Sequence, residues 1–131
     1  MKAECPARSR SITWGVTIAR GGTRAVSQRD GGLLWDARGA LVRRFDEQRR
    51  WLWDADFSPD DRLLLTASSR SDLGSTRNVL LLLRDGPSGA PRAECVGHRG
   101  NVLAVRFAPD GRLALSADRD GAVFAWPMPV A

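Results

Sequence analysis

The chain has 131 residues, 43% of them hydrophobic, and a net charge of +5, a size that normally makes one domain with a single core. Nineteen of the 20 basic residues are arginines, and they stand singly or in pairs rather than in a basic tract, which favours a solvated surface. No run of about 18 apolar residues and no apolar block near the start occurs, so we expect neither a membrane span nor secretion and predict a cytoplasmic protein.

The cysteine and histidine content argues against a metal centre. Cys5 and Cys95 are too few for a disulfide framework, and one histidine does not complete a structural zinc site. We therefore predict free, reduced thiols, no metal and no cofactor.

Short apolar runs bounded by turn residues predict an all-β chain. No apolar period of three to four residues is sustained, and glycine, proline and β-branched residues recur too often for helices. The first part of the chain predicts three strands separated by tight turns, then an outer strand, at residues 14–18, 24–27, 33–35 and 40–45.

The pattern then repeats twice. The middle copy predicts strands at 52–57, 63–67, 79–83 and 92–96, with its second turn stretched into a polar loop over 68–78. The last copy predicts strands at 102–107, 113–117 and 122–126, with turns at 108–111 and 119–121. The anchors Ile18, Phe57 and Phe107 are 39 and 50 residues apart, a spacing typical of repeat architectures.

The two ends of the chain are offset by one strand. Residues 2–5 (KAEC) parallel residues 92–95 (RAEC), whereas prolines follow Trp126 where an outer strand would come next. We therefore expect residues 1–8 to form an outer strand that completes a unit begun elsewhere. The strands are apolar on both faces, which predicts sheets packed between other sheets.

Residues 97–126 resemble a repeat of the WD-repeat β-propeller family. They carry Gly97-His98 at the start, Pro109-Asp110-Gly111, the Asp120-Gly121 turn and Trp126. The resemblance implies a partial propeller of three four-stranded blades. The blades would comprise residues 11–46, residues 50–97 with the inserted loop 68–78, and residues 98–127 without an outer strand of their own.

The resemblance also implies a hydrogen-bonded tetrad in the last blade, formed by His98, Ser116, Asp120 and Trp126. The earlier copies depart from it. In the middle copy Thr66 takes the hydroxyl position, but Gln48 and Leu83 replace histidine and tryptophan. In the first copy Ser27, Asp30 and Trp35 fit, and Ser9 replaces histidine.

Catalysis is not predicted. His98 is the only histidine, and Ser116 and Asp120 could be grouped with it as a triad. We interpret all three as structural, because they fall at tetrad positions and no nucleophile turn holds Ser116. Four carboxylates gather at Asp54, Asp56, Asp60 and Asp61, but they lack the calcium-loop pattern and are interpreted as strand-end and turn acids.

The remaining candidate function is the binding of a partner at one face of the propeller. By position, the family's peptide-binding face would carry arginines and tryptophans that suit an acidic or aromatic peptide. The candidate partner-binding residues are Arg29, Arg50, Trp51, Trp53, Arg99, Asn101 and Arg119. The alternative is that Trp14 and Trp53 pack between blades and that the arginines are merely solvated. The loop 68–78, with Arg70 and Arg77, is either a second candidate contact or simply a mobile insertion.

The sequence thus predicts a non-catalytic protein-protein interaction module or scaffold subunit. Three blades leave two open blade faces, so we expect completion as a homodimer or with a second chain, or else a fragment of a longer protein. The alternative function is an arginine-rich module that associates with nucleic acid, which would bind in a steeply salt-dependent way.

Overall fold

The computed structural model describes residues 13–22, 24–28, 31–45, 51–69 and 79–129. All regular structure in these ranges is β-strand, as the sequence predicts. The strands are β1 (Thr13–Ile18), β2 (Arg24–Gln28), β3 (Gly31–Trp35), β4 (Leu41–Phe45), β5 (Trp51–Phe57), β6 (Leu63–Ser69), β7 (Val79–Asp85), β8 (Pro91–Glu94), β9 (Val102–Phe107), β10 (Leu113–Asp118) and β11 (Val123–Pro127). The described residues contain no helix that is long and apolar enough to span a membrane.

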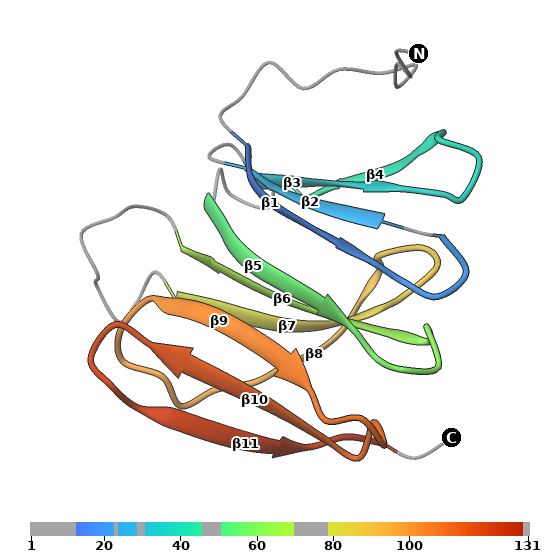
Figure 1. Ribbon diagram of the computed structural model, residues 1–131. Coiled ribbons are helices and arrows are strands. Elements are labelled where there is room, and N and C mark those ends of the chain that lie inside the picture. The colour runs from blue at the N-terminus through green and yellow to red at the C-terminus, as the bar shows by residue number, and fades with distance from the viewer. Residues whose placement is uncertain (1–12, 23, 29–30, 46–50, 70–78, 130–131) are drawn as a thin grey trace.

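Three antiparallel sheets follow one another along the chain (Figure 1). We call them the first blade (β1 to β4), the second blade (β5 to β8) and the third blade (β9 to β11). Strand order within each blade is sequential, and each strand pairs antiparallel with its neighbour in the chain. The predicted all-β partial propeller is therefore confirmed.

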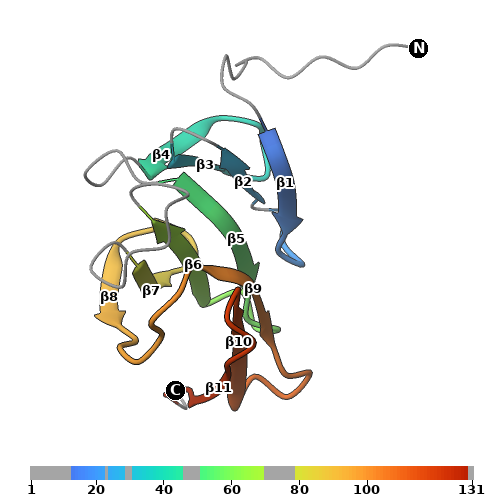
Figure 2. The same cartoon turned by 90° about the vertical axis from the view of Figure 1, so that its left-hand side faces the viewer.

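The inner strands β1, β5 and β9 lie together on one side of the molecule, and the outer strands β4 and β8 lie on the other (Figure 2). No described strand pairs with the outer edge of β11. Residues 1–8, which we predict as an outer strand, lie outside the described residues.

Some strand ends differ from the prediction. β3 begins at Gly31, two residues before the predicted start, and β6 runs to Ser69. Ser69 extends the strand because it pairs with both Trp51 and Val79, so the predicted loop 68–78 begins only after it. Residues 70–78 lie outside the described residues.

The turns carry the glycines that their backbone conformations require. Gly111 and Gly121 have φ of 74° and 89°, values that a side chain disfavours. At the place of Gly111 the second blade has Asp61, which is non-glycine and has φ 64°. A strained residue at this position indicates a compensating contact, which is described below.

The core is divided between the two blade junctions. One cluster joins the first and second blades through Leu34 and Phe45 on one side and Ala55, Phe57 and Leu64 on the other. The second cluster joins the second and third blades. It contains Leu63, Leu65, Ala67, Leu81, Leu83, Val102, Val105, Ala114 and Met128. The second blade therefore packs against a neighbouring blade on both of its faces.

Candidate functional site

The third blade contains a chain of buried polar side chains. The Trp126 Nε1–H donates to Ser116 Oγ at 2.7 Å. Ser116 Oγ lies 2.5 Å from His98 Nε2, and His98 Nδ1 lies 2.8 Å from Asp118 Oδ2. The His98 ring also stacks on Phe124, with ring centroids 4.3 Å apart. Each polar group supplies the partner that another one needs, so burial costs little.

The acid in this chain is Asp118, so the prediction of Asp120 is wrong. Asp118 ends β10 two residues after Ser116, and alternate residues of a strand share a face. Asp120 instead lies exposed in the turn, where its backbone N–H and that of Ala122 donate to Asp118 Oδ1. The turn predicted at 119–121 contains Asp120 but not Asp118, so it could have distinguished the two aspartates.

Asp118 is held in its ionised form. Burial is the largest single influence on the pKa of Asp118, and it raises that pKa. The hydrogen bonds from His98 and from the backbone N–H groups of Ala122 and Asp120 lower the pKa, and their combined effect is larger than that of burial. The pKa therefore lies below the ordinary value of 3.8. The stabilisation is present above pH 3.8 and is lost as pH falls through the lowered pKa.

The second blade uses arginine where the third uses tryptophan. Leu64 pairs with Arg84 just as Ala114 pairs with Trp126, so Arg84 occupies the tryptophan position, not Leu83 as predicted. Arg84 is 1% exposed. Its Nε donates to Thr66 Oγ1 at 2.9 Å, and its guanidinium lies 4.3 Å from the centre of the Phe45 ring. Thr66 therefore takes the hydroxyl role that the sequence predicts.

The first blade does not repeat the arrangement in register. Trp35 pairs with Arg24, and Ser27 lies three residues further along β2. In the third blade the hydroxyl residue is only two residues beyond the partner of Trp126. The predicted Ser27 is therefore not at the equivalent position, and Ser9, Asp30 and Gln48 lie outside the described residues.

The clustered carboxylates join neighbouring blades. Asp54 Oδ2 accepts from the Val105 N–H at 2.9 Å, and Asp56 Oδ2 accepts from the Phe107 N–H at 2.7 Å. Both bonds link β5 to the inner edge of β9. Within the described residues no group of three or more potential ligands could hold a metal ion, and these acids have a structural role.

Asp61 makes the corresponding bonds to the first blade. Its Oδ1 and Oδ2 accept from the backbone N–H groups of Arg20 and Gly21 at 2.9 and 2.8 Å. Glycine would relax the backbone at this position but would offer no acceptor. The contact therefore accounts for an aspartate at positive φ.

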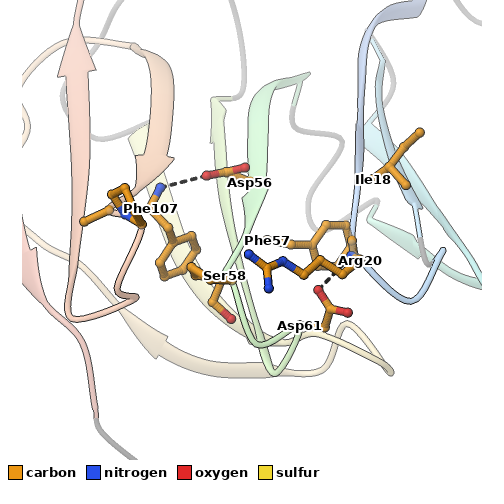
Figure 3. A pocket seen from close by; sticks show the side chains of 11 residues that line it. Ile18, Arg20, Asp56, Phe57, Ser58, Asp61 and Phe107 are labelled. Atoms are coloured by element: carbon orange, nitrogen blue, oxygen red, sulfur yellow. Dashed lines mark hydrogen bonds between the residues drawn. The ribbon is translucent and has the colours of Figure 1, made fainter.

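A cavity of about 290 Å³ lies where the three inner strands end. Ile18, Phe57 and Phe107 form apolar parts of its wall, and the Arg20 side chain extends beside Phe57 (Figure 3). The carboxylates of Asp56 and Asp61 that line it already accept from backbone N–H groups. These two carboxylates thus join neighbouring blades.

The comparison with known proteins decides the family. The family model described as "WD domain, G-beta repeat" matches residues 39–72 and 89–127, together more than half of the chain. The chain belongs to the WD-repeat family. It is also similar to Protein LST8 homolog of Drosophila melanogaster, with 29% identity over 106 residues, which are 76% of this chain and 32% of the relative. The chain therefore spans about a third of that relative's length.

The two matched WD repeats are staggered against the blades. The match at 39–72 contains β4, β5 and β6, and the match at 89–127 contains β8 to β11. Each repeat thus takes in the outer strand of one blade and inner strands of the next. The outer strand of each WD repeat pairs with the preceding blade, and the chain then continues into the next blade. Neighbouring blades are therefore joined both covalently and by strand pairing.

The predicted partner-binding residues of this WD domain differ in exposure. Trp51 and Trp53 are half-buried, with ring centroids 5.8 Å apart, and the Trp53 Nε1–H donates to Ser69 Oγ. Arg99 and Arg119 are exposed. Asn101 is buried, so its predicted place on an exposed rim is wrong.

The described candidates lie at the same end of the blades. The Arg119 N–H donates to the Asn101 carbonyl at 3.0 Å, which brings the β10–β11 turn beside the entry to β9. Trp51 begins β5 at the same end, which faces the viewer in Figure 2. Arg29 and Arg50 lie outside the described residues.

Proposed function

We propose that the chain is a non-catalytic scaffold that binds an acidic or aromatic peptide of a protein partner. WD repeats generally mediate protein-protein interactions. The observation that supports this chain's role is the pairing of two half-exposed tryptophans with exposed arginines at one end of the blades. We call Trp51, Trp53, Arg99 and Arg119 the rim.

The chemistry of the rim suits such a peptide. Tryptophan faces contribute large contact areas at low entropic cost, and arginine pairs bidentately with carboxylates. A catalytic role is not supported by the serine, histidine and aspartate of the third blade. Ser116 is 1% exposed, and its hydroxyl already accepts from Trp126, so no substrate reaches it.

The scaffold also has exposed apolar side chains on its first and third blades, and no strand among the described residues pairs with the outer edge of β11. We propose that these are covered by self-association or by a second chain, because exposed apolar faces and sheet edges favour association. Residues 1–8 are our candidate for the strand that pairs with β11.

Selection from a library of random displayed peptides tests the rim. We expect enriched peptides to be acidic or aromatic, and to lose at least about tenfold in affinity on the double substitution Arg99→Glu and Arg119→Glu. Arg112→Glu is the matched control, since Arg112 is exposed at the opposite end of the third blade. Equal binding to the rim variant and the control would contradict the proposal.

A further inference from the structure

The third blade exposes an apolar face that looks away from the second blade. We call Leu113, Leu115 and Val123 the trailing face; their side chains are 41%, 48% and 63% exposed. They lie on β10 and β11, in a register that puts Leu115 opposite Ala125 and Val123 opposite Ala117. Aliphatic side chains gathered on regular strands mark an interaction surface.

The same positions in the second blade are covered by a blade. Leu63 and Leu65 open β6 as Leu113 and Leu115 open β10. Leu81 pairs with Ala67 as Val123 pairs with Ala117. In the second blade these side chains are 6%, 0% and 1% exposed, because Val102, Val105 and Ala114 of the third blade pack on them. The trailing face thus corresponds to the surface of the second blade on which the third blade packs.

The first blade exposes the opposite kind of face. We call Val16 and Ile18, which are 60% and 65% exposed, the leading face. The equivalent residues of the second blade, Ala55 and Phe57, are buried against the first blade. Val105 occupies the same position in the third blade and is buried against the second. The molecule therefore shows twice how a leading face packs on a trailing face.

We propose that two copies of this chain associate head to tail, with the leading face of each copy packed on the trailing face of the other. The inference rests on the proposed completion of the propeller and names its partner as a second copy. The contact is heterologous, since two different surfaces meet, and two equal contacts close a ring of two copies. A contact between two trailing faces would have no counterpart among the blade junctions of the molecule.

The mass in solution of two variants and their mixture tests this geometry. Ile18→Arg disables the leading face, and Leu115→Arg disables the trailing face. In a head-to-tail dimer either variant alone spoils both junctions, so we expect each to weaken association at least about tenfold. Mixing the two variants restores one junction between intact faces. We therefore expect the mixture to associate more tightly than either variant alone.

The control is Val96→Arg, because Val96 is 78% exposed in the connection after β8 and lies on neither face. It should associate like the wild type, and thermal unfolding should show that all variants fold. If Ile18→Arg or Leu115→Arg fails to fold, Ile18→Ser and Leu115→Ser replace them.

Three results would overturn the inference: a wild-type chain that stays monomeric at 14.3 kDa at high concentration, loss of association in only one variant, or no recovery in the mixture. Substitutions in the rim should leave the mass unchanged. Failure of head-to-tail association is therefore distinguishable from failure of peptide binding.

Discussion

The residues Ser116, His98 and Asp118 have the composition and connectivity of a hydrolase triad, yet their surroundings give them a different role. Both His98 ring nitrogens are engaged, and the Ser116 hydroxyl lies between the imidazole and the Trp126 indole. A nucleophile must be reachable, and this hydroxyl is buried. In an enzyme such hydrogen bonds would activate the serine. In the third blade they satisfy polar groups that are buried.

The assignment of Asp118 predicts a difference between two neighbouring aspartates. Asp118→Ala removes the acceptor for His98 and for two backbone N–H groups, so we expect a loss of about 1–3 kcal/mol in unfolding free energy. Asp120→Ala removes an exposed turn side chain and should change stability by less than about 0.5 kcal/mol. Urea denaturation at pH 7 measures both, and equal losses would contradict the assignment.

Asp56 predicts a pH dependence of the opposite sign. Burial is the main influence and raises its pKa above 3.8, although the Phe107 N–H and the Arg106 charge act against it. A raised folded-state pKa means that stability from this group is present below pH 3.8 and declines as pH rises through the folded-state value. At neutral pH the ionised form of Asp56 therefore costs stability.

Asp56→Asn should consequently be neutral or stabilising at pH 7, because the amide mimics the protonated acid and keeps an oxygen for the Phe107 N–H. The gain should disappear below pH 3.8, where the wild-type side chain is itself protonated. Urea denaturation at both pH values measures this. Asp56→Ala, which offers no acceptor, should be destabilising at both, and a destabilised Asp56→Asn at pH 7 would refute the argument.

At the scale of elements, the second blade fastens its two neighbours through side chains that accept from their backbones. Asp61 does this at the β1–β2 turn, and Asp54 and Asp56 do it along β9. These hydrogen bonds orient whole sheets. A backbone N–H on the inner edge of a sheet points in a fixed direction, so its acceptor must lie in that direction. Apolar packing alone would allow neighbouring blades to slide.

The substitution Asp61→Gly separates the effect of backbone strain at residue 61 from the effect of the hydrogen bonds that join the first and second blades. Glycine relieves the positive φ but removes the acceptor for the Arg20 and Gly21 N–H groups, and charged hydrogen bonds are worth about 1.5–3 kcal/mol. We expect hydrogen exchange of these two amides to accelerate by about tenfold or more. Asp61→Asn, which tolerates this φ and keeps one acceptor, is the control and should show a smaller effect. Unchanged exchange in Asp61→Gly would show that packing alone holds the junction.

At the scale of the whole molecule, the three blades form a series with two unlike ends. At each blade junction a face of one blade packs on a face of the next blade in order, and the residues of the leading and trailing faces are exposed at the two ends of this series. Repeat proteins draw much of their stability from such neighbour contacts. Head-to-tail association would extend the internal junctions to the ends of the chain.

The strands and turns follow from the sequence. Apolar runs separated by turn residues predict the sheets, and the turns containing Gly111 and Gly121 lie where predicted because only glycine readily adopts their φ. The anchors Phe57 and Phe107 both end inner strands, as their shared spacing from the following turns implies. These features depend on interactions close along the chain, which a linear pattern records.

Only the tertiary structure decides which polar groups meet. Arg84 replaces tryptophan because cross-strand register after a long insertion places it opposite Leu64, and the length of a loop does not reveal that register. Asp54, Asp56 and Asp61 resemble turn acids in the sequence, whereas their partners lie 40 to 52 residues away. Such bonds depend on how blades stack, since the local sequence of either partner is compatible with a solvated side chain.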